Sequence, residues 1–151
     1  MSHVAEVNLK IFDLEALAQA SRNVGLEFKA GQTSYRWYGN WQNDYHAADA
    51  AARRGHDPRL FGKSEHAIVV PNNDRAYGIG VVPALDGVGY SMVYDNWQGG
   101  YGLEGVAGRG LERLKQEYAA EVSVRRLTAD GYAITRHVDE LGQIVIQGVS
   151  R

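Results

Sequence analysis

The chain has 151 residues, a length typical of one domain with a single hydrophobic core, and we expect residues 1–151 to form that domain. Its formal net charge is −2 at pH 7, which excludes the overall positive field that drives non-specific nucleic-acid binding. It has no cysteine, which excludes disulfides, thiol nucleophiles, iron–sulfur clusters and cysteine zinc sites.

A cytoplasmic location is the natural expectation for a cysteine-free chain of this composition. No stretch approaches the roughly 20 apolar residues of a membrane-spanning helix, so we predict no membrane association. We also predict no bound cofactor.

The first three predicted elements are a strand, a helix and a second strand. Apolar and polar residues alternate in "VAEVNLKI" (residues 4–11), a pattern typical of a half-buried strand. Asp13 is a suitable N-cap for the helix that follows, and Gly25 can end that helix in the left-handed conformation. "LEFKA" (residues 26–30) is then predicted to be a returning strand.

A helical insertion is predicted at about residues 35–63. Within it, "NDYHAADAAARRG" (residues 43–55) begins with capping residues and has an alanine-rich middle. It carries two arginines at its C-terminal end, where they favour the negative end of the helix dipole, and Gly55 can stop it.

The remainder predicts a meander, a long helix and a hairpin. "HAIVVP" (66–71), "RAYGIGVVP" (75–83) and "YSMVYD" (90–95) are rich in β-forming residues and separated by turn signals. A long helix is predicted between Leu111 and Gly131, although "VSVRRL" within it also fits an alternating strand.

In that helix a stripe at helical spacing is formed by Leu111, Leu114, Tyr118 and Val122. "YAITRHV" and "QIVIQGV" predict the closing hairpin. The element order predicts an α+β fold: an antiparallel sheet with two main helices mostly on one face, in a ferredoxin-like or doubled ferredoxin-like arrangement.

Several short segments occur in an order that resembles a known family. They are "DLEAL", "HAIVVP", "YGIGVV", "YDNW", "LKQEYA" and the closing "DGYAITRHVDELGQIVI". The chain resembles the family catalogued as domain of unknown function 1257, which has cyanobacterial, plastid, phage and plasmid members. The resemblance implies no catalytic residues, because none is established for the family. It implies an accessory or adaptor role beside a ring-forming ATPase, and it marks residues 35–63 as longer than in the short members.

Aromatic and cationic side chains concentrate around the insertion. Trp, Tyr and Arg are the usual anchors of protein interfaces, and aromatic faces also stack on bases. From Gly31 to His66 there are five Lys/Arg against four Asp/Glu, too small an excess for a groove that neutralises several phosphates. The predicted residues for binding a protein or ligand are Tyr35, Arg36, Trp37, Tyr38, Trp41, Tyr45, Arg53, Arg54, Trp97 and Arg109.

Catalytic chemistry is weakly indicated. His46, Asp49 and His56 are ligand types, yet no HExxH or comparable paired spacing occurs, so solvated side chains are favoured over a metal site. Ser64 and His66 lack a nucleophile elbow, and a histidine beside "AIVV" is more typical of packing with one backbone partner.

The six glycines of "NWQGGYGLEGVAGRG" (residues 96–110) raise the alternative of a phosphate cradle with Arg109 at its end. The Lys-Ser/Thr ending of a P-loop is missing, and the spacing is not GxGxxG after a strand. Tight turns and close packing of the sheet on a helix are therefore the favoured interpretation.

Three functional hypotheses remain. The first is a non-enzymatic binding module or adaptor that engages a protein partner through the aromatic insertion, either accessory to a ring ATPase or in a phage–host interaction. The second is a small-ligand or nucleotide binder in which the insertion acts as a lid and Arg36, Arg53 or Arg109 meets phosphate. The third is a metal-dependent hydrolase built on the three ligand types named above. Edge strands and Trp97 are compatible with a homodimer.

Overall fold

The structure, a computed structural model, describes residues 4–38 and 61–150. Most of the predicted insertion at 35–63 therefore lies outside the described residues. The elements are β1 (Val4–Glu6), α1 (Leu14–Val24), β2 (Glu27–Lys29), β3 (His66–Val69), β4 (Ile79–Pro83), β5 (Tyr90–Asp95), η3 (Trp97–Gly100), α3 (Leu103–Ala107), η4 (Arg109–Leu111), α4 (Glu112–Ala129), β6 (Tyr132–Val138) and β7 (Ile144–Ser150).

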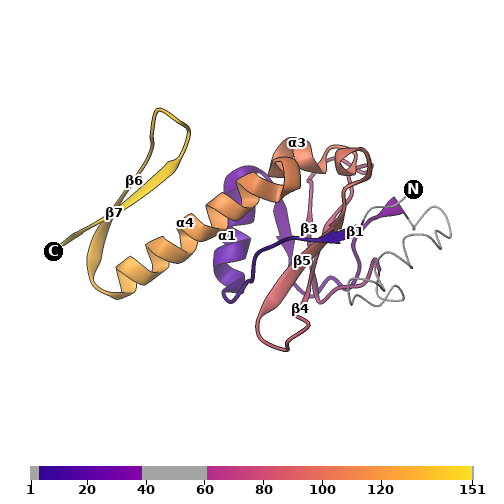
Figure 1. Ribbon diagram of the computed structural model, residues 1–151, viewed down its shortest axis with the longest axis horizontal. Coiled ribbons are helices and arrows are strands. Elements are labelled where there is room, and N and C mark those ends of the chain that lie inside the picture. The colour runs from indigo at the N-terminus through magenta and orange to yellow at the C-terminus, as the bar shows by residue number, and fades with distance from the viewer. Residues whose placement is uncertain (1–3, 39–60, 151) are drawn as a thin grey trace.

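Five strands form one antiparallel sheet in the order β1-β5-β4-β3-β2. The predicted meander is its centre, because β3, β4 and β5 are consecutive neighbours. Figure 1 shows α1 and α4 packed side by side next to this sheet. The predicted α+β class, with an antiparallel sheet and its main helices, is confirmed, and the arrangement is compatible with a ferredoxin-like fold.

Helix α1 begins and ends where its sequence predicts. The side chain of Asp13 accepts a hydrogen bond from the amide of Ala16 at 2.9 Å, satisfying one of the free donors of the first turn. Gly25 has a φ of 93°, and its N–H donates to the carbonyls of Arg22 and Ser21. This left-handed C-cap is readily adopted by glycine because it has no Cβ.

The main core lies between the sheet and the helices. Alternate residues of β4 and β5 point into it, and α1 and α4 contribute their apolar stripes. Its largest fully buried apolar side chains are Ile11, Leu17, Ile68, Ile79, Val81, Met92, Leu103, Leu111 and Leu114. The Tyr118 hydroxyl accepts hydrogen bonds from the amides of Phe12 and Asp13, which ties α4 to the start of α1.

The second half of α4 leaves the core. The helix continues through "VSVRRL", so the alternative of a strand there is wrong. The predicted stripe holds at Leu114 and Tyr118, but Val122 is 37% exposed because α4 extends beyond the sheet (Figure 1). There α4 meets the separate hairpin of β6 and β7, and Arg136 of β6 contacts Glu117 at 2.7 Å. Among the described residues, no helix combines the length and the apolar character needed to cross a bilayer.

Candidate functional site

The face of the sheet opposite the main core carries a second, smaller apolar cluster. Strand residues alternate between the two faces, so Ile79 and Val81 point to the helices while Gly80 and Val82 point the other way. On this second face Tyr35, Ala67 and Val93 are buried, with Val4, Trp37 and Val82 packed against them. No described helix covers this part of the sheet, so the segment leading into the predicted insertion supplies its cover.

Tyr35 is held over β4 by backbone hydrogen bonds on both sides of the segment that carries it. Its N–H donates to the Gly62 carbonyl at 3.0 Å, and the N–H of Gly78 donates to the Arg36 carbonyl at 3.0 Å. A Cβ at Gly80 would lie 2.5 Å from the Tyr35 ring, so the ring occupies the space that any larger residue would need. Tyr35, predicted as an interface residue, is only 3% exposed and packs mainly within its own subunit.

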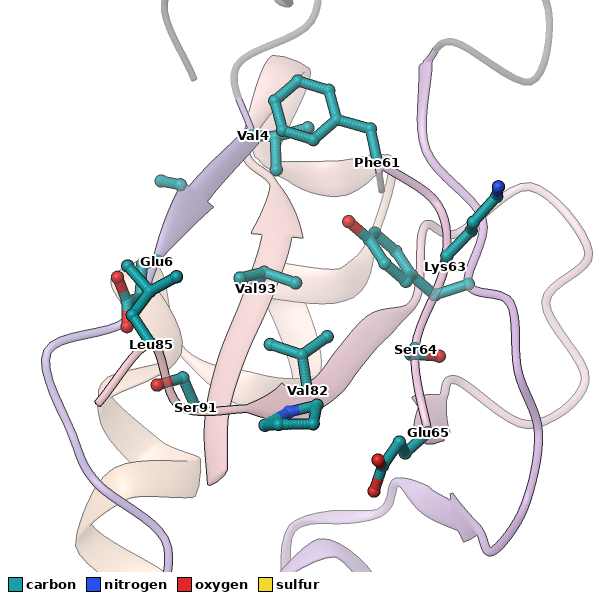
Figure 2. Close-up of a pocket in the computed structure, with 13 residues that line it drawn as sticks. Val4, Glu6, Phe61, Lys63, Ser64, Glu65, Val82, Leu85, Ser91 and Val93 are labelled. Atoms are coloured by element: carbon teal, nitrogen blue, oxygen red, sulfur yellow. The ribbon is translucent and has the colours of Figure 1, made fainter. Parts of the chain in front are cut away.

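Beside Tyr35 the second face is hollowed into a pocket of about 350 Å³. Figure 2 shows Val82 and Val93 on its floor, Phe61 and Val4 toward one end, and Leu85 across from Lys63 and Ser64. The volume falls in the range of small-molecule sites. The lining residues are Val4, Ala5, Glu6, Tyr35, Phe61, Lys63, Ser64, Glu65, Val82, Pro83, Leu85, Ser91 and Val93.

The pocket is mostly apolar with a weakly acidic rim. Two carboxylates, Glu6 and Glu65, face one ammonium, Lys63, so the formal charge of the lining is −1. The charge of Glu65 acts on the neighbouring phenol and raises the pKa of Tyr90. The Ser64 hydroxyl donates to the Gln32 carbonyl at 3.1 Å, which gives it a structural role at the wall.

Trp37 extends the same cluster toward the end of the described segment. Its ring meets the Phe61 ring edge-on, with centroids 5.2 Å apart and planes at 78°. Trp37 lies so close to Gly62 that no Cβ would fit there. Of the predicted aromatic residues, Tyr35 therefore lines the pocket, and Trp37 packs against Phe61, which also lines it.

A second group of interactions is organised by the buried carboxylate of Asp95 at the end of β5. Asp95 is fully buried, and its two carboxylate oxygens accept the backbone N–H groups of Tyr38 and Trp97, both at 3.0 Å. The rings of Tyr38 and Trp97 meet at 69° with centroids 6.4 Å apart. Burial, followed by the charge of Asp95, raises the pKa of Tyr77 to about 12. Asp95 thus brings together two predicted binding residues that are distant in sequence.

The predicted cations are not brought together. Arg36 is half-buried on the pocket side of the sheet, whereas Arg109 is exposed on η4, between α3 and α4 in the helical layer. The predicted residues Trp41, Tyr45, Arg53 and Arg54, and the weak metal candidates His46, Asp49 and His56, lie outside the described residues. Across residues 4–38 and 61–150 there is no group of three side chains arranged to hold a metal ion.

His66 has the structural role that its apolar surroundings predict. Its Nδ1 accepts the N–H of Gly31 at 2.9 Å, and its ring lies between those of Phe28 and Tyr90. This single backbone partner fixes the loop after β2. The Ser64 hydroxyl separately donates to the Gln32 carbonyl at 3.1 Å.

The glycine-rich segment forms tight turns. Gln98 and Tyr101 have positive φ values of 52°, and Gly99, Gly100 and Gly102 beside them also have positive φ. Glu104 fixes the segment, since one carboxylate oxygen accepts the Tyr94 hydroxyl at 2.8 Å and the Gly110 N–H at 3.0 Å. Burial and this carboxylate raise the pKa of Tyr94. The interpretation favoured from the sequence, turns and close packing, agrees with these contacts.

Sequence reasoning missed the pocket itself and the two residues that organise this face. The signal for Gly80 was available: the two glycines of "YGIGVV" alternate with buried residues, which indicates that something bulky lies over one face. For Asp95 the position at the end of an apolar strand gave no such signal.

Comparison with known proteins identifies no relative. No family model, no curated protein and no solved structure matches the chain. The resemblance to domain of unknown function 1257 therefore stays a prediction.

The fold should lose stability at alkaline pH through Tyr35. Burial raises the pKa of Tyr35 to about 12 from an ordinary value of 10.0, so the folded state disfavours the phenolate. The associated stability is complete below pH 10 and is lost as the pH rises toward about 12, by roughly 3 kcal/mol. Urea unfolding at several pH values in this range should show that the free energy of unfolding falls less steeply with pH for Tyr35→Phe than for the natural chain. Tyr132→Phe, which alters an exposed tyrosine, should show the same dependence of the free energy of unfolding on pH as the natural chain. Equal dependence in all three proteins would contradict this prediction.

Proposed function

We propose that the protein is a non-enzymatic binding module whose sheet-face pocket takes an apolar ligand of small-molecule size. The observation that carries the proposal is the pocket of about 350 Å³, floored by Val82 and Val93 and flanked by Tyr35 and Phe61. Transfer of an apolar group from water to such a surface is favourable, at roughly 25 cal/mol for each Å² buried. This supports the second of the hypotheses drawn from the sequence, a small-ligand binder.

The charges at the rim favour a neutral or positively charged ligand over a nucleotide. Glu6 and Glu65 outnumber Lys63, and a phosphate entering there would meet net negative charge. Arg36 and Arg109, which the nucleotide hypothesis used, lie in different layers of the fold. We therefore propose a ligand with an apolar body and, at most, a cationic end.

A protein partner is the second candidate, because apolar side chains are exposed near the pocket. Phe12, Leu85 and Val88 are 67%, 68% and 56% exposed, and Leu85 also lines the pocket. Phe12 packs beside Gly89 in the same β4–β5 turn that carries Leu85 and Val88. An apolar side chain of a partner would fill the pocket by the same physics as a small ligand. The adaptor role that the family resemblance implies, with Trp37 and Trp41 as anchors, belongs to this candidate.

Binding of a neutral apolar dye tests the pocket directly. N-phenyl-1-naphthylamine should show a saturable rise in fluorescence with one site per chain. Val82→Phe places a ring on the pocket floor and should weaken that binding at least about tenfold, since the ring takes the place where the ligand would contact Val82 and Val93. Val88→Phe makes the same substitution on the exposed turn, away from the lining, and should bind the dye as the natural chain does.

Two results would contradict the proposal. One is the absence of saturable dye binding by the folded natural chain. The other is equal binding by Val82→Phe and Val88→Phe, which would place the dye outside the pocket. Far-ultraviolet circular dichroism of both variants confirms that each is folded before binding is compared.

A further inference from the structure

The C-terminal arm, defined as residues 121–150, has an unusual distribution of apolar surface. It contains the end of α4 and the hairpin of β6 and β7, and none of its residues is buried. Five of the nine large apolar side chains that are exposed in the described residues belong to it. They are Val122, Tyr132, Val138, Leu141 and Val149.

The hairpin of this arm is an incomplete sheet within the described part of one chain. The strands β6 and β7 pair only with each other, along seven residues each. A two-stranded sheet alone is marginal in water, and it is stabilised by further strands or by packing against a helix, which α4 supplies here. Packing on α4 and the contact of Arg136 with Glu117 support one face of the hairpin, but they leave the strand edges open.

The two edges of the hairpin differ in chemistry. The strand β6 carries Arg136 and His137, whereas β7, with the sequence "IVIQGVS", contains no charge and no proline. Natural sheets protect an open edge with charges, proline or bulges, since an unprotected edge pairs with other strands. The edge of β7 has none of these residues along its length, which is typical of a strand that is paired in the working protein.

We propose that β7 pairs antiparallel with β7 of a second copy of this chain around a two-fold axis. The two hairpins then form one continuous four-stranded sheet, in which the open edge of each β7 is paired. The axis passes beside Gln147, so that Gln147 faces its own symmetry mate. In this register Val145 of each copy faces Val149 of the other, giving the exposed Val149 an apolar cross-strand neighbour.

A second copy fits this edge because an isologous contact must be complementary to itself. A charged strand paired with its own copy around a two-fold axis brings like charges together, which is unfavourable. The uncharged β7 avoids that repulsion at every position, whereas β6 would place Arg136 or His137 near its symmetry mate. The same neutrality offers no charge pattern for recognising a different, charged partner.

The proposed dimer is tested by measuring the mass in solution of the natural chain and of variants that carry a charge on one edge of the hairpin. Light scattering after gel filtration should give twice the 16.6 kDa of one chain for the natural sequence. Gln147→Lys places two like charges at the axis and should return the mass to that of one chain at the same concentration. Thr135→Lys makes an equivalent change directly across the hairpin on β6, and it should keep the doubled mass.

Cross-linking tests the register, and the chain is suited to it because it has no cysteine. In Gln147→Cys, the two new thiols face each other across the axis, within reach of a disulfide once paired. Mild oxidation should convert this variant to a covalent dimer, while Thr135→Cys, on the strand behind it, should stay as single chains. A positive result here does not depend on whether Gln147→Lys folds.

Three results would overturn the proposal. The first is a natural chain that has the mass of one copy throughout a dilution series. The second is a doubled mass that persists in folded Gln147→Lys, and the third is equal cross-linking by Gln147→Cys and Thr135→Cys. None of these results bears on the sheet-face pocket, so the proposed ligand function stands or falls separately.

Discussion

Replacing Asp95 by asparagine is expected to lower the free energy of unfolding by about 3 kcal/mol. The carboxylate of Asp95 is fully buried and accepts the N–H groups of Tyr38 and Trp97, one on each oxygen. Asparagine keeps one acceptor oxygen but turns an amide N–H₂ toward the other donor. One buried N–H then loses its partner, and the hydrogen bond that remains is made to a neutral acceptor in place of a charged one. The urea midpoint of unfolding measures the change.

The matched control is Asp86→Asn, which alters a carboxylate that is exposed in the β4–β5 turn. Asp86 pairs with Lys10, and exposed ion pairs contribute little, so its midpoint should move much less. A second readout comes from Tyr77, whose pKa is raised partly by the charge of Asp95. Asp95→Asn should lower the pKa of Tyr77, although burial, the larger cause, remains. A midpoint unchanged from that of the natural chain would show that Asp95 does not hold this part of the fold.

Gly80→Ala is expected to destabilise the fold by about 2 kcal/mol through overpacking. The new Cβ would lie 2.5 Å from the Tyr35 ring and 3.1 Å from Val93, so the ring must leave its position on the sheet. Tyr35 cannot move freely, because its backbone and that of Arg36 are bonded to Gly62 and Gly78. Gly105→Ala is the control: the space around Gly105 is open, and alanine favours the helix in which it lies, so stability should stay equal or rise.

A double-mutant cycle isolates the contact between Gly80 and Tyr35. Tyr35→Ala alone should destabilise by about 3–5 kcal/mol, the usual range for removing a buried aromatic ring. In that background the ring that blocks Gly80 is gone and only Val93, at 3.1 Å, remains close, so Gly80→Ala should have little further effect. The cycle should therefore give an interaction energy of about 2 kcal/mol, measured by urea unfolding of the four proteins. Additive effects would mean that the two residues are not in contact.

Local sequence patterns predicted most elements of this fold, although the strand predicted at residues 4–11 is limited to Val4–Glu6 and the short helix α3 was not predicted. Asp13 and Gly25 mark the ends of α1 because capping depends on a few neighbouring residues and on backbone conformations that glycine adopts freely. The period-2 and helical patterns identified the meander, α4 and the closing hairpin, since each pattern reflects one face of one element. The α+β class followed from their order.

The candidate site was decided by tertiary structure. Tyr35, Phe61 and Val93 are separated by 26 to 58 positions, and no local pattern shows that they surround one pocket. Asp95 gathers Tyr38 and Trp97 through backbone hydrogen bonds, and such bonds leave no signature in residue type. Val122 continues the apolar stripe of α4, but it is exposed because the helix runs past the sheet. Periodicity reports which side chains share a face, whereas burial and ligand-sized space depend on which other segment, distant in sequence, packs against that face.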